Sequence, residues 1–264
     1  MVLTDAQIDL IRESSLTTSR VLAEIAAQIK PGITGNELDA IAHERITATG
    51  GTPSFLGFGG FPKSVCISVN EAVVHGIPDD TPLQPGDVVS IDCGVHLNGF
   101  HGDQAYSFLL AGGTDEVRTL LEVTRASLLA AIDQAVVGNR VGDIGHAVQQ
   151  MCEREHGYGV VRELVGHGLG TELHDAPEIP NYGRRGSGSK LTENMCIAIE
   201  PMVNLGTRKV VTRPDGWTIA TRDGKPSAHF EHDVVVKRGE AIVLTDFGII
   251  DEAVAANDAL ELIE

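Results

Sequence analysis

The sequence contains little cysteine and few positive charges. Its four cysteines show no CxxC spacing, which argues against a disulfide framework and against a structural zinc site. We expect four reduced thiols in the core, at Cys66, Cys93, Cys152 and Cys196. The chain carries 20 Lys and Arg against 37 Asp and Glu, a formal net charge of −17. Such a surface repels phosphate backbones, so a direct nucleic-acid site is not expected.

Long apolar runs are also missing. No uncharged apolar stretch is long enough to span a membrane, and the opening residues, MVLTDAQIDLIRESS, place acids where a secretory signal has its basic segment. The sequence therefore predicts a cytoplasmic protein without a membrane contact. With 42% hydrophobic residues the chain can bury a substantial core, and no Ser/Pro-rich linker or charge block divides it. We expect a single domain over residues 1–264.

Periodicity and capping signals predict an α+β arrangement. Thr4 with Gln7 and Thr34 with Glu37 have capping-box spacing, and each pair precedes apolar residues at helical spacing, the first run ending at Pro31. Further helices are expected at 114–136 and 142–156. Strands are expected at 64–70, 87–94, 101–109, 159–164, 194–202, 208–212, 217–222 and 227–237. These elements predict a curved antiparallel sheet with helices on one side, which leaves the other side for a site.

The stretch SIDCGVHLNGFHGDQAYSF, residues 90–108, places two acids in a strand pair. Asn98–Gly99 is the dipeptide typical of a two-residue hairpin turn. Counting outward from this turn places Asp92 opposite Ala105. It also places Asp103 opposite Gly94, so both carboxylates point to the same face of the sheet. A three-residue loop or a bulge would reverse this parity.

Two carboxylates on one face can converge on one spot, where they repel each other. A buried, unpaired carboxylate is costly by several kcal/mol, and a bound cation resolves the repulsion. The alternative is that Asp92 and Asp103 are solvated residues at a sheet edge. We favour the cation because two acids occur together in this strand pair.

Three further residues are candidate metal ligands. Glu200 lies in the apolar strand signal of ENMCIAIEPMV, and Glu231 stands at the start of a β-branched run in SAHFEHDVVV. His167, in VGHGLG, lies between glycines, which allow the backbone to approach a ligand closely. Each has an ordinary alternative as an edge or loop residue. Together with Asp92 and Asp103 they give four carboxylates and one neutral imidazole, whose charge of −4 two divalent cations neutralise. This oxygen-rich set of ligands favours Mn, Fe(II) or Co.

The motifs SIDCG…HGD, GHGLG, IEP and FEH resemble those of the type I methionine aminopeptidases, which share the pita-bread fold with aminopeptidase P and creatinase. The resemblance extends over essentially the whole chain, including FPKSVCISVNEAVVHGIPDD and DGWT. It implies a metallo-exopeptidase that removes the initiator methionine from nascent proteins and peptides with a small second residue. It also implies two divalent metal ions held by Asp92, Asp103, His167, Glu200 and Glu231.

The resemblance assigns catalytic roles to His75, in VVHGIP, and His174, in ELHDAP, which would hold the substrate amide and the developing oxyanion. Glu200 would carry a proton toward the departing amine. Each histidine could instead be an ordinary core or surface residue. Four other histidines are treated as structural candidates near the site: His96, His101, His229 and His232.

The Gly-rich loop GTPSFLGFGGFP, residues 51–62, is expected to form part of a methionine pocket. The resemblance places the pocket residues at Phe55, Phe58, Phe61, Cys66 and Trp217. The family commonly has Tyr at the positions of Phe58 and Phe61. Without these hydroxyl groups the pocket would be drier and would still suit the flexible thioether of a methionine side chain. The alternative is that these aromatic residues belong to the core.

Two other functions remain open at this point. An aminopeptidase P or prolidase would share the fold but usually carries an additional N-terminal domain. A type II methionine aminopeptidase has an insertion for which the interval from His167 to Glu200 is too short. A non-catalytic binding protein on this fold would have lost ligands and gained a basic face. We expect a monomer whose partners are the N-termini of peptides or nascent chains, with a transient ribosome contact.

Overall fold

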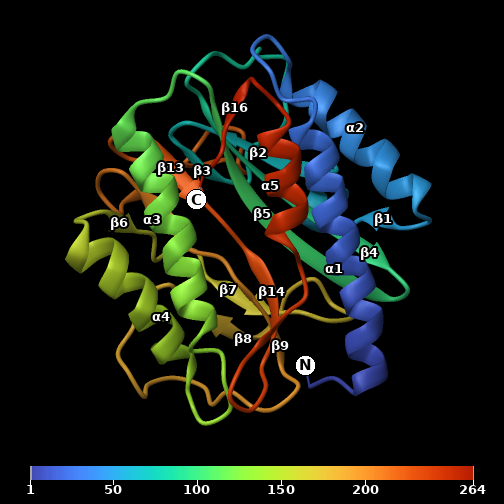
Figure 1. Ribbon diagram of the computed structural model, residues 1–264, viewed down its shortest axis with the longest axis vertical. Helices are drawn as coiled ribbons and strands as arrows, with labels where there is room; N and C mark the ends of the chain where they lie inside the picture. Colours follow the sequence, from blue (N-terminus) through green and yellow to red (C-terminus); the bar gives the residue numbers. More distant parts are fainter. Residues whose placement is uncertain (1, 264) are drawn as a thin grey trace.

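The protein is described by a computed structural model covering residues 2–263, and its five α-helices are spread along the chain (Figure 1). They are α1 (Asp5–Ala26), α2 (Gly35–Ala48), α3 (Asp115–Ile132), α4 (Val141–Gln149) and α5 (Phe247–Ala255). A 3-10 turn, Phe58–Gly60, follows α2, and a π-helical segment, Gln150–Glu155, continues directly from α4.

The strands are short, apart from one long hairpin. The first eight are β1 (Thr52–Pro53), β2 (Val65–Val69), β3 (Ala72–Val74), β4 (Val88–Leu97), β5 (Phe100–Leu110), β6 (Gly159–Val160), β7 (Gly166–Gly168) and β8 (Asp175–Ile179). The others are β9 (Cys196–Ile199), β10 (Met202–Asn204), β11 (Val210–Thr212), β12 (Ile219–Thr221), β13 (Ser227–His229), β14 (His232–Val235), β15 (Ile242–Val243) and β16 (Leu260–Glu261).

The first two helices begin where the capping signals predicted. The side chains of Thr4 and Thr34 each accept a hydrogen bond from the backbone N–H three residues later. The side chains of Gln7 and Glu37 in turn accept a hydrogen bond from the backbone N–H of Thr4 and Thr34. The expected ends are less accurate. Helix α1 ends at Ala26, before Pro31, and the helix expected at 142–156 gives way to π-helical turns after residue 149.

The β4–β5 hairpin has the predicted register. Asp92 pairs with Ala105 and Asp103 with Gly94, and the turn is the two-residue Asn98–Gly99. Both turn residues have positive φ, 54° and 82°, as this hairpin type requires. The parity argument from the sequence is therefore confirmed, and the two carboxylates share one face.

Within residues 2–263 the strands form four sheets, whereas the sequence analysis expected a single curved sheet. The first has the order β1-β4-β5-β16 with β2 also on β4, and the second has the order β15-β14-β9-β7-β8. Two three-stranded sheets, β13-β10-β6 and β11-β12-β3, complete the set. The ladders between these strands are antiparallel, and the two larger sheets meet where the Glu231 N–H donates to the Ala105 carbonyl at 3.0 Å.

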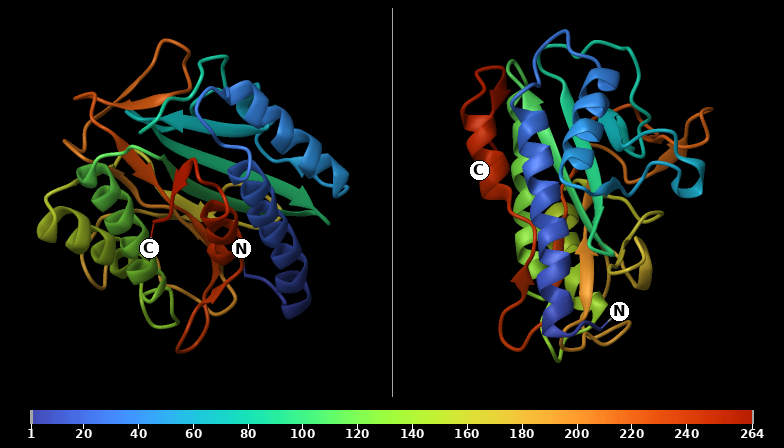
Figure 2. Two further views of the ribbon diagram at one scale, coloured as in Figure 1. Left: turned by 45° about the horizontal axis from the view of Figure 1, so that its top comes forward. Right: turned by 90° about the vertical axis from the view of Figure 1, so that its right-hand side faces the viewer.

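The helices cover one face of the strands, as expected. Figure 2 shows α1, α3 and α5 in a layer on one side, with the loops that surround the site on the other. Alternation along β5 explains this arrangement, since Tyr106 and Phe108 point into the helical layer while Asp103 and Ala105 point away from it. Tyr106 packs on Phe247 of α5 at 5.1 Å between ring centroids.

The cysteines are as predicted, since Cys66, Cys93, Cys152 and Cys196 are all buried free thiols. Among residues 2–263, the structure has no helix that combines the length and the apolar composition needed to cross a bilayer.

Candidate metal centre and substrate pocket

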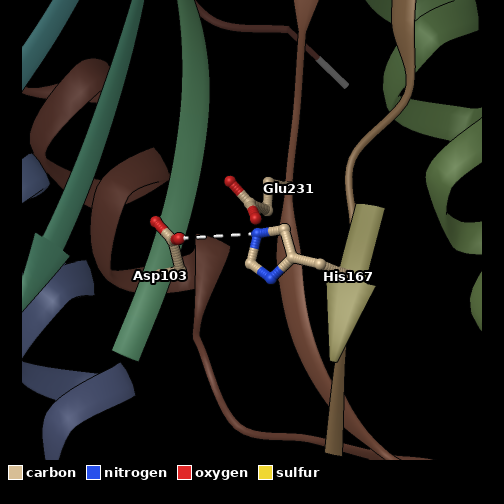
Figure 3. A group of neighbouring side chains, drawn as sticks. All are labelled: Asp103, His167 and Glu231. Atoms are coloured by element: carbon tan, nitrogen blue, oxygen red, sulfur yellow. Dashed lines mark ion pairs between the residues drawn. The ribbon is translucent and has the colours of Figure 1, made fainter. Parts of the chain in front are cut away.

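Five segments of the chain bring the candidate metal ligands together. Asp92 comes from β4, Asp103 from β5 and His167 from β7. Ligand atoms of Asp103, His167 and Glu231 all lie within 4.8 Å of one another, and Figure 3 shows the three side chains pointing toward a common point. The Nε2 of His167 is 3.9 Å from Asp103 Oδ2.

The two glutamates occupy interruptions between strands, not the strands that the sequence analysis expected. Glu200 lies between β9 and β10, and Glu231 lies between β13 and β14. Glu200 Oε1 is 3.7 Å from His167 Nε2, so Glu200 adjoins the same group. A break in pairing lets a side chain turn out of the pleat, which suits a ligand better than a regular strand position does.

Several carboxylate oxygens in this group have no partner. Asp92 Oδ1, Asp103 Oδ1 and Glu231 Oε1 are fully buried and accept no hydrogen bond. An unsatisfied buried oxygen of this kind is costly, and divalent cations with oxygen preference are its natural partner. The donor set therefore fits a divalent metal ion.

Electrostatics in the metal-free protein agree with that interpretation. Burial, reinforced by the neighbouring carboxylates, raises the pKa of Asp103 and of Glu231 well above the ordinary values. Burial also raises the pKa of Asp92 to about 7 and that of Glu200 to about 8. It lowers the pKa of His167 to about 4, so this imidazole is neutral at pH 7 and able to ligate a metal.

The glycines beside His167 have a different role from the predicted one. The sequence analysis expected them to admit a ligand, but a Cβ at Gly166 would lie 2.3 Å from the Ala198 carbonyl oxygen. A Cβ at Gly168 would lie 2.3 Å from the Ala176 carbonyl oxygen. Both glycines are therefore needed because the flanking strands β9 and β8 pack closely on β7, and this packing fixes the position of His167.

One cavity of about 130 Å³ is lined by all twelve residues that the sequence analysis selected. They are Phe55, Phe58, Phe61, Cys66, His75, Asp92, Asp103, His167, His174, Glu200, Trp217 and Glu231. The cavity is thus apolar at one end and acidic at the other. The structure places the two ends in contact, which the sequence could not establish.

The apolar end is built by aromatic contacts. Phe61 and Trp217 meet edge to face at 5.2 Å, and Phe55 and Phe61 are buried. Phe58 is 48% exposed at the mouth and contacts the His174 ring at 5.1 Å. Hence Phe55 and Phe61 combine core packing with a pocket wall, whereas Phe58 is not a core residue.

The two candidate catalytic histidines stand beside the ligand group. The rings of His174 and His167 are 4.3 Å apart at 90°. His75 has a φ of 56°, a left-handed conformation that is uncommon for residues other than glycine. Burial lowers the pKa of His174, and it lowers the pKa of His75 to about 4, so both are neutral donors at pH 7.

Two further buried residues lie near the centre: His229, which the sequence analysis named as a structural candidate near the site, and Asp233, which it did not select. His229 is buried, and its Nε2 lies 3.4 Å from Glu200 Oε2. Asp233 is fully buried, and its Oδ2 accepts hydrogen bonds from the Ser15 hydroxyl at 2.6 Å and from the Asp103 N–H at 2.9 Å. An acid directly before the β-branched run VVV was the available signal for Asp233.

Buried acids and a neutral imidazole beside an apolar pocket define a metal-dependent hydrolase. The model of metallopeptidase family M24 matches residues 9–238. A methionine aminopeptidase of Clostridium perfringens is 48% identical over 239 residues, covering 90% of this chain and 96% of the relative. The crystal structure of methionine aminopeptidase from Rickettsia prowazekii superposes with a TM-score of 0.91 at 37% identity, covering 93% of this chain and 99% of that one.

An X-Pro aminopeptidase structure from Thermotoga maritima has a TM-score of 0.73 at 23% identity, covering 93% of this chain and 62% of that chain. At this identity the similarity indicates the shared fold alone. The chain belongs to metallopeptidase family M24 and, within it, to the type I methionine aminopeptidases. The predicted α+β pita-bread fold and the resemblance stated from the sequence are confirmed.

Proposed function

We propose that this methionine aminopeptidase removes the N-terminal methionine from peptides and nascent chains whose second residue is small, using two divalent metal ions. One observation carries the proposal. The buried acidic group and the aromatic pocket are two ends of a single cavity. A methionine side chain in the apolar end therefore places the first peptide bond of the substrate beside the acids.

The proposed ligands are Asp92, Asp103, His167, Glu200 and Glu231. Their four carboxylates carry −4 when ionised, which two divalent cations neutralise. One imidazole among oxygen ligands would favour Mn, Fe(II) or Co. Metal ions held there would supply Lewis-acid activation of water and of the scissile carbonyl.

The chain's own groups have distinct tasks in the proposed reaction. The N–H groups of His75 and His174 would donate hydrogen bonds to the substrate amide and to the oxygen on which negative charge develops. Both imidazoles are neutral at pH 7, and a neutral imidazole retains one N–H with which to donate a hydrogen bond. A carboxylate oxygen of Glu200 would accept a proton and transfer it to the departing amine.

The position of the pocket also limits the substrate. A free α-amino group is small and polar, so it can lie at the metal-binding end of the cavity. An acetyl or formyl group on that nitrogen would need additional space in a cavity of about 130 Å³. Peptides with a blocked N-terminus should therefore be refused.

The decisive experiment measures free methionine released from Met-Ala-Ser, with and without a chelator. Release that stops on chelation and returns with Mn(II), Fe(II) or Co(II) supports the proposal. Met-Leu-Ser and acetyl-Met-Ala-Ser are the matched controls, and neither should be cut. Full release by a preparation that elemental analysis finds free of metal would refute the metal mechanism, and efficient cleavage of an X-Pro peptide would favour a prolidase-like activity.

Location and partners follow from the same proposal. The four buried free thiols suit the reducing environment of the cytoplasm, where nascent chains are processed. A monomeric state and a transient ribosome contact stay predictions of the family resemblance.

A further inference from the structure

A second cavity, of about 600 Å³, adjoins the site, and none of the aromatic pocket residues lines it. It shares four wall residues with the first cavity, and these are His75, His167, His174 and Glu200. The two cavities therefore meet at the candidate metal centre. If the proposed function holds, the methionine fills the first cavity and the rest of the substrate must continue into the second.

The second cavity has an apolar floor and an acidic rim. Val74, Leu164 and Met202 form the floor, and Val74 and Met202 are buried. Glu163 and Glu178 stand at the exposed rim. None of the residues that line the cavity is Lys or Arg.

The nearest base along the chain does not neutralise this rim. Arg162 precedes Glu163, but its guanidinium makes a 2.9 Å ion pair with Glu153. Glu163 accepts only a 3.1 Å hydrogen bond from the Arg162 backbone N–H among the bonds of the described residues. The carboxylate of Glu163 thus keeps its charge available to a ligand in the cavity.

Glu178 is held close to the centre by strand pairing. It lies in β8, next to Ile179, which pairs with Gly166. Gly166 is adjacent to His167, so the rim and the candidate metal centre are joined by a rigid strand pair. An extended peptide advances about 3.3–3.6 Å per residue, so only the first few residues after the cleaved bond reach this rim.

We propose that the second cavity receives the third to fifth residues of the substrate and that Glu163 and Glu178 select Lys or Arg over Asp or Glu at these positions. The aliphatic stem of Lys or Arg packs on the apolar floor while its charged end reaches the rim. An acidic side chain meets like charges instead. The second residue of the substrate remains limited by the centre itself.

The test compares kcat/KM for three peptides with the same start, Met-Ala-Lys-Lys-Ser, Met-Ala-Gln-Gln-Ser and Met-Ala-Glu-Glu-Ser. At low ionic strength we expect the lysine peptide to exceed the glutamate peptide by about tenfold, because two exposed charge contacts act together. The preference should shrink at 0.5 M salt, where the screening length is about 4 Å.

The variant Glu163→Gln with Glu178→Gln should bring the lysine-to-glutamate ratio close to one and leave the glutamine peptide within about twofold of wild type. The matched control removes two exposed glutamates from helices α3 and α5, as Glu116→Gln with Glu252→Gln, and should keep the full ratio. A wild-type ratio near one, or a ratio unchanged in the Glu163/Glu178 variant, would overturn the inference. Failure to cut the glutamine peptide would instead count against the proposed function, so the two failures are distinguishable.

Discussion

The metal-free protein should lose stability as the pH rises from 7 to 8. In the folded state burial raises the pKa of Asp92 to about 7 and that of Glu200 to about 8. Both carboxyls titrate near pH 4 when the chain is unfolded. The folded state therefore binds more protons than the unfolded state, and stability falls as these protons are lost.

The pH range of the test matters because other buried groups make stability change with pH in the opposite direction. His75 and His167 have a pKa lowered to about 4, so below about pH 6.5 their contribution to stability rises with pH, against that of the carboxyls. Buried thiols act only near and above their ordinary pKa of about 8.5. Between pH 7 and 8 the carboxyls dominate, and linkage gives a loss of about 1 kcal/mol from Glu200 and a smaller loss from Asp92. Asp103, Glu231 and Asp233, whose pKa values are also raised by burial, add losses in the same direction.

The assay is urea unfolding of the chelated protein at pH 7.0, 7.5 and 8.0. The losses from Glu200 and Asp92 alone lower the midpoint by about 0.5 M urea, and the other buried carboxyls add to this shift. Two controls isolate the cause. Glu200→Gln removes one of the titrating groups and should reduce the loss by about 1 kcal/mol. The metal-loaded protein should lose most of the dependence, because bound cations replace the protons of the ligand carboxyls. A metal-free protein whose stability rises or stays constant across this window would refute the argument that these acids are buried against each other.

Three further predictions follow from the geometry. His174→Ala should lower kcat by about 10²-fold or more, with little change in KM or metal content. His167→Ala should lose metal and activity together, and excess metal ion should rescue it in part. Kinetics and elemental analysis measure both variants. Asp233→Ala removes the acceptor that holds the Asp103 N–H, so metal affinity should fall about tenfold or more in a metal titration, while Asp233→Asn, which keeps an acceptor, should stay closer to wild type. Gly102→Ala should destabilise the fold by about 1–3 kcal/mol in urea unfolding, because its Cβ would lie 2.4 Å from a backbone nitrogen of α1, and an unchanged midpoint would contradict that contact.

The sequence by itself determined the features that depend on a few neighbouring residues. The Asn98–Gly99 turn and the alternation of strand residues fixed the hairpin register, and with it the common face of Asp92 and Asp103. The capping boxes fixed the starts of α1 and α2 for the same reason, since each is a contact over three residues. The family motifs then selected the twelve residues that line one cavity.

Tertiary structure decided how distant segments meet. Neither β7, which is three residues long and carries His167, nor helix α5 was predicted from the sequence, because packing against other elements holds both of them and not a local pattern. It also could not show that the flanking glycines of His167 face neighbouring strands, or that Asp233 holds the Asp103 backbone from 130 residues away. Such contacts form only when separate sheets pack together, and this packing places the acids, the imidazole and the aromatic pocket around one cavity.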